Sequence, residues 1–520
     1  MKLQRDTSFY QKCIKKYRWT IGACLFFIIL KISTAFLLWD GRLIPPVPTD
    51  SFIYIGHIAS VAQCPTLFFC QDSYSLQSFK GLEHFTYRVI LGMLHLITGL
   101  SALSVYKLTF FIGPFLLLFS IYIFLRNFTK NDKELAILII FLALFTGGGG
   151  YHGFYWVVPS YFAFIFFLLL YSVLLNDQER RPFLKITLYV VLGGFTHNIF
   201  FYLLSILGFH TVLSYFLERK SFFTKLKKLT FTFLVSIICY VPFSPFLSKI
   251  LGLPISSSPY ALESFFINAD EFKSLSSVYL DYYQWIFFHW FGYILFFSTL
   301  FLLIYNKQFR FLSVFASSFL FVTIASFFPH GERSLIILWP MTFILFAFGF
   351  ILIQKNILSY FKKVSTQKIF LCTTWFLFII FTLLNISYSY LLIKRINEYE
   401  NITISQQLVQ ELYQESLTRK VIPLVATNYN SSILSAYLFS FSQKPLSITT
   451  DLSQADLFVD ISINNTSDTS KVAKIIGIIS KELNIKRSTT TYRLDNSHIL
   501  DSAFILKTKN SDYSLYTRKP

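Results

Sequence analysis

The sequence predicts a polytopic α-helical membrane protein with about eleven transmembrane helices and a small C-terminal α/β domain outside the membrane. The first observation is composition. Of 520 residues, 54% are hydrophobic and only 14% are charged, with a mean hydropathy of +0.55, whereas a typical soluble domain has roughly 25% charged residues. Second, apolar runs of about twenty residues, long enough to cross the hydrocarbon layer, recur from Trp19 to Lys394. Third, a polar tail rich in Ser, Thr and Asn follows them.

The apolar runs divide the chain into a transmembrane part, residues 1–394, and a tail, residues 395–520. One apolar stretch, residues 184–217, is too long for a single ordinary helix, and the polar segment Thr196-His197-Asn198 interrupts its middle. We therefore interpret that stretch as two spans. The expected spans are 19–39, 105–126, 134–149, 157–175, 184–197, 199–217, 229–247, 285–306, 310–328, 335–354 and 368–393.

The distribution of Lys and Arg orients these spans. A basic segment ahead of the first span places the N-terminus in the cytoplasm. The apolar run 89–103 could cross the membrane or lie along its outer surface. The surface placement brings every later cluster of Lys and Arg to the cytoplasmic side, so the positive-inside rule favours it. The first outer loop then extends over residues 40–104, and the odd number of spans brings the tail to the outer side.

The tail combines short hydrophobic runs with amphipathic stretches, which predicts a small extracytoplasmic α/β domain. Its sequence contains no nucleophile elbow, phosphate loop or metal-binding pattern, so we expect a docking or covering module. The expected strands are 421–426, 457–463, 489–494, 503–507 and 513–517, and the expected helices are 432–440 and 471–483.

A net charge of +19 could indicate nucleic-acid binding, but the basic residues form short clusters between apolar runs instead of one patch. That pattern is typical of oriented membrane proteins, so we expect no nucleic-acid partner. The six cysteines show no metal-ligand spacing. Cys64 and Cys70 both fall in the first outer loop and could form a disulfide in an oxidising compartment.

Two carboxylates in the first outer loop are candidates for catalysis because they lie beside the membrane and near aromatic residues. Asp40 follows the first span directly, and Asp50 follows a proline-rich stretch that stiffens the chain. Asp50 could cap the helix that follows. It could instead be a general base that takes a proton from an acceptor hydroxyl while a sugar leaves a phosphate. Asp40 could likewise be this base or a simple interfacial residue.

The layout around Asp50 resembles the GT-C superfamily of membrane glycosyltransferases, which includes protein O-mannosyltransferases, oligosaccharyltransferases and lipid A aminoarabinose transferases. In that group a short cytoplasmic N-terminus and one span precede a long outer loop with an acid followed by aromatics, here Asp50-Ser-Phe-Ile-Tyr54. The break at Gly193-Gly194-Phe195-Thr196-His197 and the late outer loop containing Arg333, before Pro340, are also similar. The resemblance is one of order and sidedness over most of the chain.

The resemblance implies inverting transfer of a sugar from a polyprenyl-phosphate-linked donor to a glycan, lipid or protein acceptor. Asp50 matches the family's catalytic acid and would be the general base. Arg333 matches the late-loop position that can hold the donor phosphate, which suits a planar guanidinium; it could also pair with Glu332 or anchor the interface. His197 could bind the donor phosphate or be hydrogen-bonded within the helix bundle.

Aromatic residues of the outer loops could line a sugar or acceptor site, because aromatic rings stack on sugars. The candidates are Tyr54 in the first loop and His152, Tyr155 and Trp156 in the second. The second-loop residues fit an aromatic belt at the membrane surface equally well. That loop contains no acid, whereas the oligosaccharyltransferase branch has paired acids in an outer loop and binds a divalent metal. We therefore expect that no metal is required.

Two alternatives to the enzyme remain at this point. A transporter or flippase of lipid-linked glycans would need polar groups in mid-span and often has internal repeats. Here Lys31 and His210 are nearly the only titratable residues deep in a span, and no repeat is visible. A non-catalytic membrane scaffold is the other alternative. For any of these functions, the expected location is the bacterial plasma (inner) membrane, with the tail outside.

Overall fold

The computed structural model consists of two compact units, which are described separately. One unit comprises Met1–Phe36, Gly81–Tyr87 and Thr109–Tyr390, and the other comprises Leu37–Lys80, Arg88–Leu108 and Leu391–Pro520. The structure describes residues 16–39, 54–55, 58, 61, 85–144, 159–197, 199–217, 222–241, 250, 290–327, 335–360, 365, 367–376, 380, 408, 411–412, 414, 424–427, 447–448, 455–461, 504–509 and 513–519.

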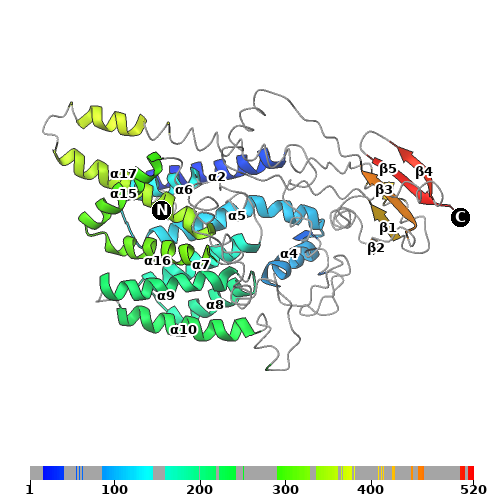
Figure 1. The fold of residues 1–520 in the computed structure, drawn as a ribbon, viewed down its shortest axis with the longest axis horizontal. Helices are drawn as coiled ribbons and strands as arrows, with labels where there is room; N and C mark the ends of the chain where they lie inside the picture. The colour runs from blue at the N-terminus through cyan, green and yellow to red at the C-terminus, as the bar shows by residue number, and fades with distance from the viewer. Residues whose placement is uncertain are drawn as a thin grey trace, which may run out of the picture. The chain divides into compact units, whose positions relative to one another are not determined.

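Most of the described chain is helical (Figure 1). Three of the described helices are long and apolar enough to cross a membrane, at Ala102–Leu125, Ile199–Leu217 and Ile336–Asn356. This is a membrane protein; its number of spans remains a prediction. The helices are α2 (Arg18–Trp39), α4 (Phe85–Thr98), α5 (Ala102–Leu125), α6 (Asp132–Leu144), α7 (Pro159–Leu175), α8 (Pro182–Gly194), α9 (Ile199–Leu217), α10 (Phe222–Tyr240), α15 (Trp290–Tyr305), α16 (Phe309–Ala325) and α17 (Leu335–Tyr360).

Helix α4 overlaps the apolar run 89–103 that we predicted to follow the outer surface. It has 14 residues, or about 21 Å of helix, which is shorter than a hydrocarbon core of roughly 30 Å. Its end is set by Gly99, whose φ of +67° lies in the left-handed region that glycine tolerates best. The Gly99 N–H donates to the carbonyl of His95 at 3.0 Å. The run 89–103 therefore comprises most of α4, a turn and the first two residues of α5, which begins at Ala102.

Helix α10 buries polar side chains against the protein and exposes large apolar ones, which is the arrangement expected of a helix that faces lipid. It begins at Phe222, earlier than the predicted span 229–247. The first turns contain three lysines, so their hydropathy is too low for a predicted span. Two of these lysines, Lys225 and Lys228, are buried against the protein, whereas Lys227 is exposed. The buried residues are Lys225, Lys228, Leu229, Thr232, Ser236 and Cys239, and the large exposed apolar residues are Phe223, Leu226, Phe233, Leu234, Ile237 and Ile238. A water-soluble helix would have the opposite arrangement.

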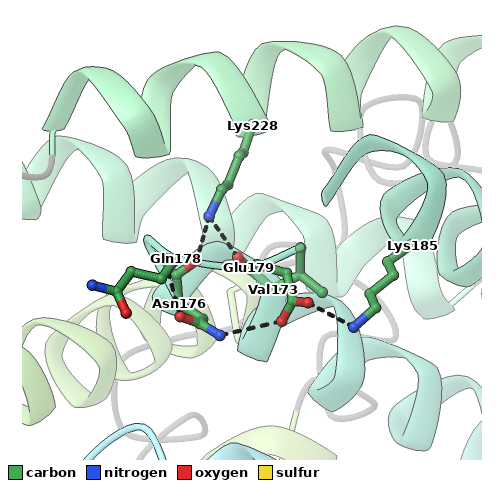
Figure 2. Close-up of polar contacts among 6 residues, drawn as sticks. All are labelled: Val173, Asn176, Gln178, Glu179, Lys185 and Lys228. Carbon is green, nitrogen blue, oxygen red and sulfur yellow. Dashed lines mark hydrogen bonds and ion pairs between the residues drawn. The ribbon is translucent and has the colours of Figure 1, made fainter. Parts of the chain in front are cut away.

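Polar contacts join helix ends that the alternating topology assigns to the cytoplasmic side. Figure 2 shows Lys228 of α10 donating to the carbonyls of Val173 (2.8 Å) and Asn176 (2.6 Å) at the end of α7. Glu179 accepts from the Asn176 amide at 3.2 Å and pairs with Lys185 at 2.6 Å. Lys228 thereby satisfies carbonyls that a helix end leaves without intrahelical partners.

Two further contacts join predicted cytoplasmic ends. Glu134 of α6 pairs with Lys355 of α17 at 2.6 Å. The Asp132 carboxylate, also on α6, accepts from the N–H groups of Trp19 (3.1 Å) and Thr20 (3.0 Å) and from the Thr20 hydroxyl (2.6 Å) at the start of α2. These contacts are consistent with an up-and-down arrangement, since each joins ends expected on one side.

The described tail forms a five-stranded mixed sheet of order β2-β1-β3-β5-β4 (Figure 1). Strand β1 pairs in parallel with β2 and β3, and β5 pairs antiparallel with β3 and β4. Ala455, Phe458 and Phe504 form its core with Tyr516 packed against them. The strands are β1 (Leu424–Thr427), β2 (Ser447–Ile448), β3 (Leu457–Ile461), β4 (Phe504–Lys509) and β5 (Tyr513–Arg518).

Four of these strands overlap predicted ones, and β2 was not predicted. The predicted strand 489–494 and the helices 432–440 and 471–483 lie outside the described residues, so the α/β domain and its boundary at 395 remain predictions. Parallel pairing requires a crossover connection, usually a helix, which is consistent with the predicted helix before β2.

Close packing of α15 on α17 yields a stability prediction. A Cβ added to Gly349 of α17 would lie 2.1 Å from Oγ1 of Thr299 on α15. We expect Gly349→Ala to lower the free energy of unfolding by about 1–3 kcal/mol through overpacking. The matched control is Gly208→Ala on α9, where the nearest atom lies 3.9 Å away. Thermal unfolding in detergent measures both; equal melting temperatures for the two variants would contradict the packing argument.

The Asp132 contact predicts a pH dependence. Partial burial would raise the pKa of this carboxyl, but the hydrogen bonds from Thr20 and Trp19 and the charge of Arg18 outweigh it and hold the pKa below its ordinary value of 3.8. The stabilisation is therefore complete above the unfolded-state pKa and is lost as the pH falls through the lower folded-state value. We expect Asp132→Asn to cost about 1 kcal/mol at pH 7.

Melting temperatures of the wild type and Asp132→Asn, followed from pH 7 to pH 3, test this. Their difference should stay constant near neutrality and shrink below about pH 4. A difference that widens on acidification would show that the pKa is raised instead.

Candidate functional site

Three segments distant in sequence meet at the end of the bundle that the topology assigns to the outer side. The Thr86 N–H at the start of α4 donates to the carbonyl of Phe195 just after α8, at 2.9 Å. The ring centroids of Phe85 and Phe195 are 6.3 Å apart. Tyr87 lies 5.6 Å from Phe162 at the start of α7. We call these five residues the aromatic junction, which holds the start of α4 against α7 and the α8–α9 break.

His197 lies in that break. The break predicted from the sequence is confirmed, since α8 ends at Gly194 and α9 begins at Ile199. The side chain is only 7% exposed. Its Nδ1 accepts a hydrogen bond from the backbone N–H of Ile199 at 3.0 Å, so it caps the start of α9. This contact agrees with the interpretation of His197 as hydrogen-bonded within the bundle, and its role in phosphate binding stays a prediction. Because Nδ1 accepts, the neutral ring carries its proton on Nε2, the nitrogen that could donate to a phosphate.

Two glycines allow the break to be this tight. A Cβ on Gly193 would lie 2.3 Å from the ring of Phe200, and one on Gly194 would lie 2.8 Å from the ring of Phe201. Any larger residue would push the end of α8 away from the start of α9. The Gly193 carbonyl also accepts the backbone N–H of His197 at 3.2 Å. The glycines therefore determine where the His197 ring lies.

Tyr54 is the other predicted site residue that the structure describes. It is buried, at 6% exposure, as are Ile55, Ile58 and Val61 after it. Val61 packs on α4, because a Cβ on Gly92 would meet its side chain at 2.4 Å. The chain after the predicted catalytic acid is thus held against α4. The predicted residues Asp40, Asp50, His152, Tyr155, Trp156 and Arg333, together with Cys64 and Cys70, lie outside the described residues.

The sequence reasoning missed Tyr161 on the first turn of α7. Its side chain is 3% exposed, and no hydrogen-bond partner for its phenol oxygen is present in the described part of the chain. The sequence carried one signal, since this tyrosine follows the second outer loop and Pro159 directly. A tyrosine at that position resembles an ordinary belt residue, and only its burial without a partner sets it apart.

The chain is similar along most of its length to membrane glycosyltransferases of known structure. It matches the Archaeoglobus fulgidus oligosaccharyltransferase tethered to an acceptor peptide with the NVT sequon, at TM-score 0.54 and 13% identity over 91% of this chain and 69% of that one. It also matches AglB of that organism, in complex with an inhibitory peptide and a dolichol-phosphate, at TM-score 0.54 and 11% identity over 86% and 70%.

A third similar structure is ArnT from Cupriavidus metallidurans bound to undecaprenyl phosphate. The TM-score is 0.53 and the identity 10%, over 95% of this chain and 98% of that one. No protein-family model and no curated protein sequence matches this chain. At such low identities the likeness establishes the fold alone, which is similar to that of these membrane glycosyltransferases. The resemblance expected from the sequence layout is thereby confirmed.

Two substitutions of His197 separate its structural role from a role in binding. Asn retains an acceptor that can cap the Ile199 N–H but lacks the donor at Nε2. We expect His197→Asn to keep the wild-type melting temperature and His197→Ala to lose about 1 kcal/mol of stability. Binding of undecaprenyl phosphate should weaken in both. If His197→Asn binds as tightly as the wild type, the residue is a helix cap and not a phosphate ligand.

Proposed function

We propose that this protein is an inverting GT-C type glycosyltransferase of the plasma (inner) membrane, with a cytoplasmic N-terminus and an extracytoplasmic tail. It moves a sugar from a polyprenyl-phosphate donor to a glycan, lipid or protein acceptor on the outer face. The observation that carries the proposal is the fold likeness, which extends over 95% of this chain and 98% of ArnT. The two oligosaccharyltransferase matches cover only 69% and 70% of those chains, so the ArnT-like layout fits better.

The proposed reaction is a single displacement. Asp50 takes the proton of the acceptor hydroxyl, whose oxygen forms a bond to the anomeric carbon. The bond from that carbon to the phosphate oxygen breaks, and the electron pair leaves on the phosphate. Attack opposite the leaving group inverts the configuration. Asp40 is the alternative base.

Two residues are proposed to hold the donor phosphate. Arg333 would stabilise the negative charge that develops on the leaving oxygen, because its guanidinium can donate two parallel hydrogen bonds. His197 would donate from Nε2, in keeping with its acceptor role at Nδ1. Tyr54, His152, Tyr155 and Trp156 would line the sugar or acceptor site. No divalent metal is included, because the second outer loop contains no acid and phosphate charge can be balanced by Arg333.

Substitution of Asp50 tests the base. Transfer of radiolabelled sugar from a panel of polyprenyl-phosphate sugars to membrane acceptors should fall about 10²-fold or more in Asp50→Asn, as expected for loss of a general base. Donor binding should persist, because the phosphate ligands are unchanged. The control is Asp132→Asn, which alters a carboxylate at the opposite end of the bundle and should leave transfer per folded molecule unchanged.

Two results would contradict parts of the proposal. Transfer that survives in Asp50→Asn would move the base to Asp40 or to one of the acids of the predicted third outer loop, which are Glu263, Asp270, Glu271 and Asp281. A wild-type protein that binds none of the polyprenyl-phosphate sugars would contradict the transferase itself and favour a non-catalytic scaffold. Binding followed by movement of the intact lipid across vesicles, without transfer, would indicate a flippase.

A further inference from the structure

Tyr161 has an unusual position for a buried tyrosine. It lies on the first turn of α7 with 3% of its surface exposed, and its phenol oxygen has no hydrogen-bond partner in the described part of the chain. A buried hydroxyl that leaves water without finding a partner destabilises the fold, so native proteins keep few of them. Each one requires an explanation, and a ligand that completes the hydrogen bond is one.

A second buried tyrosine on the same helix has the hydrogen-bond partner that is usual for a buried hydroxyl. Tyr171 is also fully buried, and its hydroxyl lies 3.3 Å from Oγ of Ser317 on α16. Helix α7 thus carries a tyrosine near each end, one paired within the bundle and one not. The contrast argues that the lack of a partner is specific to the Tyr161 end of α7.

That end of α7 is part of the aromatic junction. The ring of Tyr161 lies 5.9 Å from that of its neighbour Phe162, which in turn packs on Tyr87. The backbone of Thr86 then bonds to Phe195, next to the break that contains His197. The phenol therefore belongs to the end of the bundle where His197 lies.

The chemistry of these groups indicates the kind of ligand. The phenol of Tyr161 can donate or accept a hydrogen bond, and a ligand that uses its O–H must be an acceptor. An ionised phosphate oxygen is a strong acceptor, and hydrogen bonds to charged groups are the stronger ones. In a polyprenyl-phosphate lipid the phosphate joins the prenyl chain to the aqueous side, which is the level of the helix ends.

We propose that Tyr161 is a donor-binding residue whose phenol donates a hydrogen bond to a phosphate oxygen of the polyprenyl-linked donor, an inference that rests on the proposed function. The residue would contact the phosphate in the substrate and in the polyprenyl phosphate product. It takes no part in proton transfer to or from the acceptor.

Tyr161→Phe removes only the hydroxyl, and Tyr171→Phe is the matched control on the same helix. Full-length proteins in detergent are titrated with undecaprenyl phosphate, and affinity and melting temperature are measured. We expect the Kd to rise about tenfold in Tyr161→Phe, with no loss of melting temperature in the absence of lipid. Tyr171→Phe should show the reverse: an unchanged Kd and a lower melting temperature, because its bond to Ser317 is lost.

Two further titrations identify the contacted group. Undecaprenol, which lacks the phosphate, should bind the wild type and Tyr161→Phe equally. Inorganic phosphate should compete with undecaprenyl phosphate less well in Tyr161→Phe than in the wild type. An effect of Tyr161→Phe on inorganic phosphate alone, with undecaprenyl phosphate unaffected, would overturn the proposal in favour of a free-phosphate site.

Three other outcomes would overturn the inference. Equal affinity of the wild type and Tyr161→Phe for undecaprenyl phosphate would reject Tyr161 as a ligand and leave the proposed function intact. A lower melting temperature of lipid-free Tyr161→Phe would show that the hydroxyl has a structural partner. A wild type that does not bind undecaprenyl phosphate would overturn the inference together with the proposed function.

Discussion

The absence of hydrogen-bonding solvent in the bilayer core is the constraint on which the rest of this structure depends. Every polar group within a span must find its partner in the protein, so polar side chains turn inward and apolar ones face the lipid. Several polar residues of helix α10 follow this rule. The hydroxyls of Thr232 and Ser236 each donate a hydrogen bond to the backbone carbonyl one turn earlier, at 2.8 and 2.6 Å. Lys225 donates to the hydroxyl of Ser214 on α9 at 3.1 Å.

The same constraint acts most strongly at helix ends, where backbone groups lack intrahelical partners. The end of α7 is closed by Lys228, which reaches it from α10, and Arg310 of α16 donates to the carbonyl of Leu175. The start of α2 is closed by the Asp132 carboxylate. Cations near these ends therefore have two roles. In the predicted topology they lie on the cytoplasmic side, as the positive-inside rule expects, and in the structure they join helices by capping the end of α7.

At the opposite ends of the helices the same need for hydrogen-bond partners fixes the orientation of the His197 ring. The break between α8 and α9 exposes the N–H of Ile199, and the His197 ring satisfies it through Nδ1, which directs the proton to Nε2. The glycines before the break bring this ring close to the start of α9. Tyr161 is an exception to the rule, and not the only one among the described residues, since its buried hydroxyl has no partner in that part of the chain. The proposed lipid-linked donor would supply the acceptor that this hydroxyl lacks.

The sequence by itself determined the class of the protein, most helix positions and the break at His197, because hydropathy and polar interruptions are properties of neighbouring residues. It also predicted four of the described strands and, from the order of its motifs, the GT-C fold. The roles of Asp50 and Arg333 come from their loop positions in that layout. Only the tertiary structure decided that Lys225 and Lys228 are inside, that α10 begins at Phe222, and that His197 caps a helix while Tyr161 lacks a partner. These facts depend on contacts between helices that are far apart in the chain. A short stretch of sequence does not show which residues of another helix will pack against it.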